Sequence, residues 1–387
     1  MELWEKVLVS QQFLKTDHGQ ISCTECHGGN ASGTEWKGAH QGLVADPTYP
    51  DPSKACGQCH EDISKKIQSS LHYTLYPYKR MLQIRANKDP DIYPKVEAAF
   101  KTHCTGCHST CGACHVSRPD YVEGGFVNGH LFKKHSNMVN QCTACHGSRV
   151  GNEYMATLEE SDPDIHFEKK RMDCVSCHKA DELHGDGMIE HADRYDVSQK
   201  YVRCENCHEK VLHDDIEAHV KHRQKLACQV CHSQEYVNCA ICHVGRDDKG
   251  IPYFKNKKEW HGFKIALNPD PKPARPYRYI VVRRVPATFD IYDYYVKDGM
   301  DPVDFYTLPT WKYASPHNIR RTTEHSKNCN NCHGNEDLFL SESDMYPKKN
   351  IKANRALIVP KEAIPEKIKG REVEKKEVPK TIPKLSW

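Results

Sequence analysis

The chain has 387 residues, of which 38% are hydrophobic and 28% are charged. This apolar content is low for a chain long enough to form two or three domains, so the polypeptide alone offers a weak core. The 55 Lys and Arg residues nearly balance the 52 Asp and Glu residues, and the formal net charge of +3 gives no support for a nucleic-acid partner. No segment approaches the run of about 18 apolar residues that a membrane-spanning helix needs, so we expect no transmembrane segment.

The pattern Cys-x-x-Cys-His occurs ten times and accounts for all twenty cysteines. The cysteine pairs are Cys23 and Cys26, Cys56 and Cys59, Cys104 and Cys107, Cys111 and Cys114, Cys142 and Cys145, Cys174 and Cys177, Cys204 and Cys207, Cys228 and Cys231, Cys239 and Cys242, and Cys329 and Cys332. The histidines that follow them are His27, His60, His108, His115, His146, His178, His208, His232, His243 and His333. This pattern is the attachment site of a c-type haem. Its thiols add to the two vinyl groups and its histidine reaches the iron, so we predict ten covalently attached c-type haems.

Zinc sites and disulfides are the competing interpretations of paired cysteines. Neither needs a histidine directly after every second cysteine. At this composition, with 25 His in 387 residues, a histidine would follow by chance roughly 6% of the time. Ten such events in ten pairs have a chance on the order of one in 10¹². The sequence therefore strongly favours haem.

The first two regions of the chain carry most of the predicted sites, four in 1–120 and five in 121–249. With about 39 residues for each porphyrin, the rings themselves are expected to form the core. We therefore predict a mostly irregular fold in which short α-helices pack around a chain of ten haems. The short steps from Cys104 to Cys111 and from Cys228 to Cys239 predict two closely spaced haem pairs.

Ninety residues separate Cys239 from Cys329, and this step contains the most strand-like sequence. Residues 277–285 are rich in Tyr, Ile and Val, and residues 289–296 are a second candidate strand. We predict a haem-free insert with a small β element at about 250–316. The last haem site then occupies 317–345.

Residues 346–387 are predicted to form an extended C-terminal arm. Pro360, Pro365, Pro379 and Pro383 make a helix unfavourable here. The spaced Val and Ile residues and the terminal Trp387 suit an arm that docks on a neighbouring subunit beyond about residue 350. The alternative is that the arm folds back on its own haem domain.

A low-spin electron-transfer haem needs a second axial ligand, and fifteen histidines remain for ten irons. We expect bis-histidine ligation throughout. The predicted distal ligands are His18, His40, His72, His103, His130, His166, His184, His219, His222 and His317. His261 is an alternative to His103, and His18 is a candidate for donation across a subunit contact. His135, His191, His213 and His325 stand beside charged residues and are expected to be solvated.

Two of the predicted distal ligands, His219 and His222, stand three residues apart on a predicted helical stretch at 211–226. Residues at this spacing share one face of a helix. We therefore expect them to serve two different haems.

The ten motifs, which span residues 23–333 and include the fused pair at 104–115, resemble those of multihaem c-type cytochromes from anaerobic, often metal-reducing prokaryotes. Secreted members that polymerise into conductive filaments are similar in length and haem density. The resemblance implies extracellular electron transfer through a head-to-tail homopolymer, whose redox donor and acceptor the sequence does not identify. It also implies that the chain is more an electron-transfer protein than an enzyme.

Two other classes remain open from the sequence. One is a multihaem periplasmic oxidoreductase with an open iron site, and the other is a carrier subunit of a reductase complex. Because haem is attached covalently outside the cytoplasmic membrane, we expect a secreted protein, extracellular or periplasmic, whose signal peptide has been removed.

Overall fold

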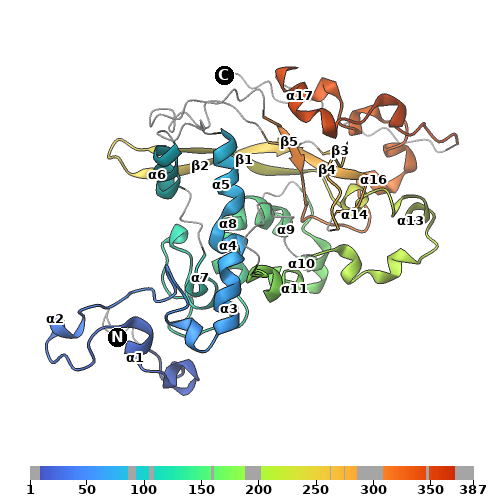
Figure 1. Cartoon of the computed structure of the whole chain (residues 1–387). Coiled ribbons are helices and arrows are strands. Elements are labelled where there is room, and N and C mark those ends of the chain that lie inside the picture. Colours follow the sequence, from blue (N-terminus) through green and yellow to red (C-terminus); the bar gives the residue numbers. More distant parts are fainter. Residues whose placement is uncertain are drawn as a thin grey trace.

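The structure is a computed structural model that describes residues 9–85, 93–103, 109–157, 161–187, 202–261, 263–273, 275–285, 308–345 and 348–370. For 236–246 and 252–261 it describes the backbone. The described chain is mostly short helices and irregular segments, with a small antiparallel sheet towards the C-terminus (Figure 1). This agrees with the coarse fold class predicted from the sequence.

Most α-helices have one or two turns. In the first half of the chain they are α1 (Cys23–His27), α2 (Trp36–Ala39), α3 (Glu61–Lys66), α4 (Leu71–Thr74), α5 (Tyr76–Arg85), α6 (Tyr93–His103), α7 (Cys111–His115), α8 (Thr143–His146), α9 (Asn152–Met155), α10 (Ile165–Lys170), α11 (Cys174–Cys177) and α12 (Ala180–Leu183). The later ones are α13 (Glu217–His222), α14 (Cys228–His232), α16 (Glu324–Lys327) and α17 (Ile351–Asn354).

The Cys-x-x-Cys-His motif is itself the unit of helical structure in much of the chain. Helices α1, α7 and α14 each coincide with one complete motif, and 3₁₀ turns begin at Cys56, Cys204 and Cys329. One helical turn brings the two cysteines of a motif to the same side, because residues i and i+3 are neighbours on a helix. Polar caps define several starts: the Thr110 hydroxyl accepts the Ala113 N–H at the start of α7.

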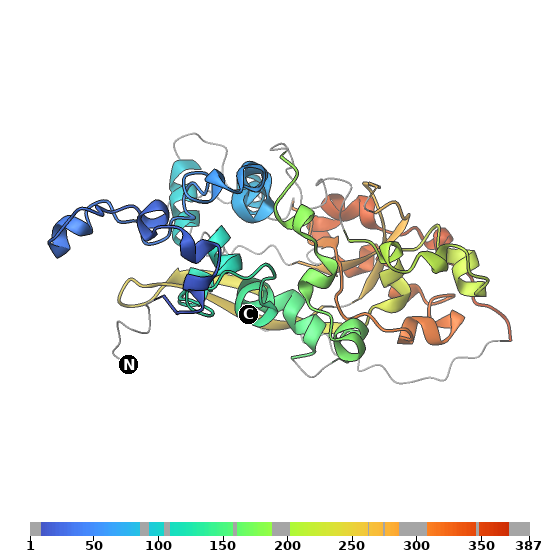
Figure 2. The ribbon, with the colours of Figure 1, turned by 90° about the horizontal axis from the view of Figure 1, so that it is seen from below.

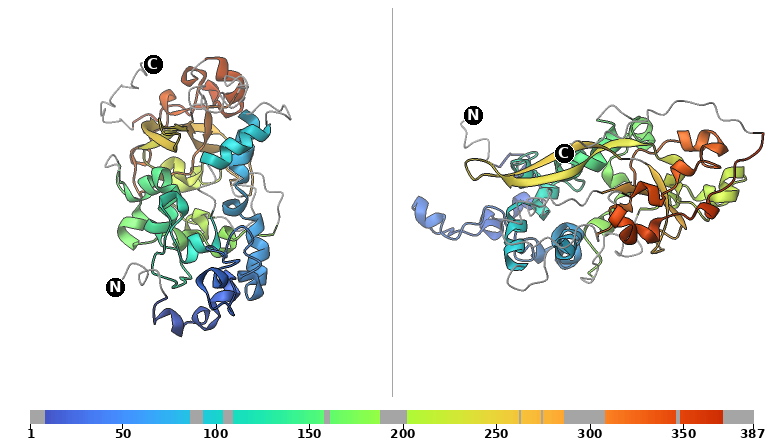
Figure 3. Two further views of the ribbon diagram at one scale, coloured as in Figure 1. Left: turned by 90° about the vertical axis from the view of Figure 1, so that its left-hand side faces the viewer. Right: turned by 90° about the horizontal axis from the view of Figure 1, so that it is seen from above.

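In the described residues, five strands form two antiparallel sheets. Strands β1 (Tyr236–Arg246) and β2 (Pro252–His261) form a hairpin, and β3 (Lys264–Leu267), β4 (Tyr279–Arg284) and β5 (Trp311–Tyr313) form a sheet in the order β3-β4-β5. The hairpin lies along the helices of the N-terminal half (Figure 3), with β2 against α6 and β1 against α9. Its turn is closed by Asp247, whose carboxylate accepts the N–H groups of Lys249 and Ile251.

The strand predicted at 277–285 is confirmed as β4, whereas the candidate at 289–296 lies outside the described residues. Strand β1 begins at Tyr236, before the β region predicted at about 250, and it carries the ninth motif, 239–243. The hairpin turn at Asp247 pairs this motif segment with residues 255–258 of β2. The sequence pattern of the motif itself does not show this pairing.

The apolar core surrounds the three-stranded sheet. Ile265, Ile280, Val282 and Leu340 are at most 2% exposed and pack with Val230 of α14. The motif-bearing N-terminal half has no comparable cluster among the described residues; its few buried apolar side chains, such as Leu75 and Leu131, are scattered. The polypeptide therefore supplies a core for its C-terminal part alone.

The described part of the C-terminal arm, 348–370, folds back on this core. The prediction of an extended arm that docks on a neighbouring subunit beyond about residue 350 is therefore wrong for these residues. Val359 is 3% exposed, and its N–H donates to the Leu340 carbonyl. The Ile368 N–H donates to Asn330. Short helical turns fit between the prolines, and the spaced Val and Ile side chains pack on the chain's own sheet.

The first and last described motifs lie at opposite ends of the molecule (Figures 1 and 2). Helix α1, which holds the first motif, is at the end where the N-terminal segment protrudes, and α16, which directly precedes the last motif, is at the other. In the described part of the chain, every helix is too short or too polar to cross a bilayer.

Candidate functional site: a continuous cavity lined by paired histidines

One continuous cavity of about 4170 Å³ runs through the described structure. Every cysteine and histidine of eight motifs lines it; these motifs begin at Cys23, Cys56, Cys111, Cys142, Cys174, Cys204, Cys228 and Cys329. The space amounts to about 520 Å³ for each motif, within the range of roughly 300–1,000 Å³ that is typical of cofactor pockets. The missing apolar core of the N-terminal half is thus matched by a cavity of cofactor dimensions.

Each of these eight motif histidines faces one other histidine across the cavity. The ring centroids of the pairs are 5.8–6.3 Å apart. The pairs, with the motif histidine first, are His27 and His130, His60 and His18, His115 and His184, His146 and His72, His178 and His317, His208 and His166, His232 and His219, and His333 and His222. All eight partners belong to the set predicted from the sequence as distal ligands.

This separation fits two imidazoles bound to one metal from opposite sides. A metal–nitrogen bond is about 2 Å long and the ring centroid lies about 1 Å behind the nitrogen, so such centroids are roughly 6 Å apart. With two cysteines beside each pair, the donor set matches a covalently held bis-histidine haem. A structural zinc site instead gathers four ligands, and no group of three or more His, Cys, Asp or Glu residues in the described ranges is arranged around one point.

Many of these imidazoles are oriented by a hydrogen bond at Nδ1, which leaves Nε2 as the nitrogen available to a metal. His27 Nδ1 bonds to the Val44 carbonyl at 2.8 Å, and His115 Nδ1 bonds to the Lys133 carbonyl at 2.7 Å. The same kind of bond joins His222 to Ala218 and His317 to Ser315, both at 2.8 Å. Such outer bonds fix the tautomer and the direction of a metal-binding imidazole.

Burial keeps several of these imidazoles in the neutral form that binds metal. Loss of solvent, followed by the nearby His146 ring, lowers the pKa of His72 to about 4. Loss of solvent, and secondarily the nearby His178 ring, lowers the pKa of His317 to about 4 as well. The pKa values of His18, His130 and His184 are also lowered, chiefly by burial.

Neighbouring motifs place cysteines close enough to influence one another electrostatically. The first cysteines of neighbouring motifs lie beside each other in three places, and these are Cys56 with Cys111, Cys142 with Cys174, and Cys204 with Cys228. Weaker electrostatic influences link Cys26 with Cys56, Cys114 with Cys142, Cys177 with Cys207, and Cys231 with Cys332. The eight described sites therefore follow one another in the order of their motifs along the chain.

The structure does not bring every predicted residue into this arrangement. His40 faces no motif histidine in the described ranges; its ring packs on Trp36 at 4.8 Å, and its Nδ1 bonds to the Trp36 carbonyl. The third motif, Cys104, Cys107 and His108, lies outside the described residues, as do the side chains of His103, Cys239, Cys242 and His243. His18, a candidate for donation to another subunit, instead faces His60 of its own chain.

One histidine predicted to be solvated is not. His325 stacks on Phe263 with ring centroids 4.1 Å apart, and burial lowers its pKa to about 4. Its charged neighbour Glu324 suggested a surface position, but Glu324 lies on an exposed side of the one-turn helix α16 while His325 turns inward.

Three carboxylates at the site were not predicted from the sequence. Asp164, Glu182 and Asp214 each accept a hydrogen bond from an imidazole of one pair, on His166, His178 and His219 respectively. Glu182 follows His178 by four residues, but His178 and Lys179 are extended between α11 and α12, so helical spacing does not account for this contact. Asp164 and Asp214 depend on turns that precede α10 and α13, for which the sequence carries no signal.

Comparison with known proteins adds no relative to this description. No family model matches the chain, and neither a curated protein nor a solved structure matches it.

Proposed function

We propose that this protein is a decahaem c-type cytochrome that conducts electrons along a line of closely spaced bis-histidine haems. The observation that carries the proposal is the set of eight motif histidines, each about 6 Å from one predicted distal histidine, along one cavity. Bound haem supplies a one-electron Fe(III)/Fe(II) couple at each position.

The chain's own residues have three roles in this proposal. The cysteine pairs hold each ring covalently, so that the spacing between neighbouring rings is set by the polypeptide. At the eight described sites, the paired imidazoles would occupy both axial positions of the iron and leave none open for a substrate. The closeness of cysteines of successive motifs, as between Cys26 and Cys56 and between Cys231 and Cys332, places each ring next to the following one.

Haem content and spin state test this proposal. We expect ten haems per chain by pyridine haemochrome assay and by intact mass, and no stoichiometric high-spin ferric signal by electron paramagnetic resonance. Stoichiometric zinc in place of haem would contradict the proposal. One high-spin haem per chain would favour the alternative of an oxidoreductase with an open iron site.

We also propose that copies of the chain associate head to tail outside the cell. The first and last described sites lie at opposite ends of the molecule (Figure 2), so end-to-end contact of two copies extends the line of sites. A head-to-tail contact whose rotation does not close a ring produces an open filament. The described tail, 348–370, takes no part in this proposal because it packs on its own core.

Electron microscopy of the secreted protein tests the association. We expect filaments whose axial repeat follows the long dimension of one chain. Discrete single-copy particles at the same concentration would contradict the polymer and leave the electron relay standing as a periplasmic or complex-bound carrier.

A further inference from the structure

Three consecutive sites of the line carry a carboxylate directly behind one imidazole. At the site of Cys174, His178 Nδ1 lies 3.0 Å from a Glu182 oxygen. At the site of Cys204, His166 Nδ1 lies 2.8 Å from Asp164 Oδ1. At the site of Cys228, His219 Nδ1 lies 2.7 Å from Asp214 Oδ2.

The sites at the two ends of the described line differ from these three. At the first site, His27 bonds to the neutral carbonyl of Val44. At the last site, His222 bonds to the carbonyl of Ala218 and His333 to that of Glu366. The end sites and the three inner ones therefore share the two-imidazole geometry and differ in the charge behind the rings.

The sign of the expected effect follows from charge. A carboxylate that accepts the Nδ1–H bond makes the imidazole a more basic ligand. Ferric iron carries one more positive charge than ferrous iron, so a nearby negative charge stabilises the oxidised state, and it does so more strongly where water is excluded. Hydrogen bonding to axial ligands is one of the means by which a protein sets a haem potential.

We propose that Glu182, Asp164 and Asp214 are positioning residues that hold the haems at Cys174, Cys204 and Cys228 at lower potentials than the haems at Cys23 and Cys329. This inference rests on the proposed function. Electrons that enter at either end of the line then meet a run of three low-potential positions. The end haems are reduced first, and the inner three are reduced last.

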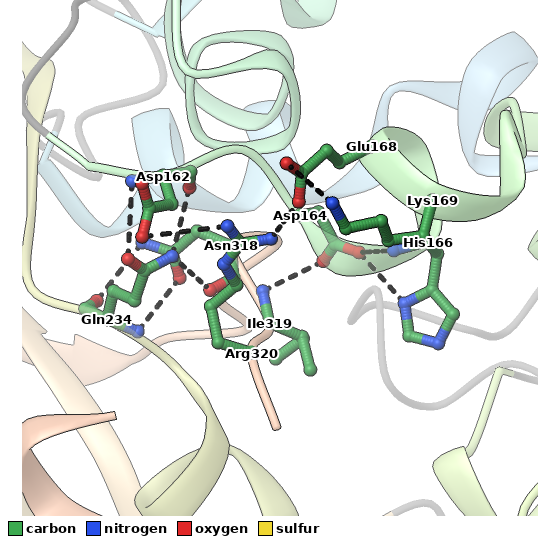
Figure 4. Close-up of polar contacts among 9 residues, drawn as sticks. All are labelled: Asp162, Asp164, His166, Glu168, Lys169, Gln234, Asn318, Ile319 and Arg320. Carbon is green, nitrogen blue, oxygen red and sulfur yellow. Dashed lines mark hydrogen bonds and ion pairs between the residues drawn. The ribbon is translucent and has the colours of Figure 1, made fainter. Parts of the chain in front are cut away.

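Among the three carboxylates, Asp164 is expected to lower the potential of its haem most strongly. Figure 4 shows its polar contacts. Its side chain is 3% exposed; Oδ1 also accepts the His166 N–H, and Oδ2 accepts the Ile319 N–H. The nearby Arg320 pairs with Glu168 and Asp162. In the described part of the chain Asp164 forms no ion pair with a lysine or arginine, so no cationic side chain shares its charge with the imidazole.

Asp214 has a weaker expected effect because it shares its charge. Arg223 Nη1 lies 3.5 Å from Asp214 Oδ1, so a positive charge stands beside the carboxylate. Glu182 is also expected to act less strongly than Asp164, because its side chain is 22% exposed and water screens it.

Removal of each charge with retention of an acceptor oxygen tests the proposal in the full haem-loaded protein. The variants are Glu182→Gln and Asp214→Asn, with Glu217→Gln as the matched control. Glu217 is an exposed carboxylate on α13, the helix of His219, and it pairs with Lys221. Asp164→Asn is a third variant, in which the cap of α10 is also changed.

The measurement is a spectroelectrochemical titration in which an electrode supplies and removes one electron per haem. In each test variant, we expect one tenth of the absorbance change, that of a single haem, to move from the low-potential end of the curve to a higher potential. The reduction equilibrium of that haem should shift about tenfold towards the ferrous state, which is about 59 mV for one electron. The curve of Glu217→Gln should overlay that of the unmodified protein, and Asp214→Glu should restore the low potential.

Several outcomes would overturn the inference. Test curves that overlay the control, with ten low-spin haems present, would do so and leave the proposed function intact. A shift in potential accompanied by a high-spin signal would mean that the carboxylate is needed to keep the imidazole bound to the iron. That result would also overturn the inference. A protein without ten haems would contradict the proposed function itself, a result that the haem assay separates from the other two.

Discussion

Replacement of both His219 and His222 by alanine is expected to produce two high-spin haems in each chain, and replacement of either one alone should produce one. The two side chains lie on α13 but face different motif histidines, His232 and His333, with ring centroids 6.2 and 6.1 Å apart. Each alanine therefore removes the sixth ligand of a different iron. Electron paramagnetic resonance of the oxidised protein counts the high-spin centres.

His213→Ala is the matched control for this experiment. His213 is an exposed histidine that precedes the same helix, and in the described part of the chain it faces no motif histidine. We expect no high-spin signal from this variant. A double variant with one high-spin haem, or a control with any, would show that the assignment of the two rings is incorrect.

The second large effect is expected on stability, from Asn354→Ala. The Asn354 side chain is fully buried, and its Oδ1 accepts the N–H groups of Thr310 and Trp311 at 3.0 and 2.9 Å. Its Nδ2 donates to the Asn350 carbonyl at 2.8 Å. An unsatisfied buried N–H costs about 1–3 kcal/mol, so the loss of both acceptor bonds should lower the free energy of unfolding by roughly 2–6 kcal/mol.

Thermal unfolding of the haem-loaded protein measures this change, with Asn30→Ala as the control. Asn30 is exposed, and its side chain accepts the Ser32 N–H in a surface turn. We expect a small change from this control and a clearly lower melting temperature for Asn354→Ala. Equal melting temperatures would mean that the segment after residue 348 does not hold strand β5 in place.

The ten motifs determined the cofactor prediction from the sequence alone, because the haem attachment chemistry depends on residues within five positions of one another. The set of distal histidines was also largely predictable, since a surplus of histidines and the flanks of each limited the choice. Eight of the ten predicted members stand opposite motif histidines. The shortness of the helices followed in the same way from the low apolar content and the frequent motifs.

Tertiary structure alone decided which distal histidine faces which motif histidine. Partners such as His178 and His317 are 139 positions apart, and no local pattern carries information over that distance. Tertiary contacts also decided that a strand begins at Tyr236, because that strand depends on its hairpin partner. They likewise decided the position of the tail, whose Val359 packs on the core of its own chain. The charges behind the imidazoles, above all Asp164, also arise from turns that only the folded chain defines. Local chemistry thus carries the prediction of the number and kind of sites, while long-range packing sets the pairing, the order and the surrounding charge of the described ones.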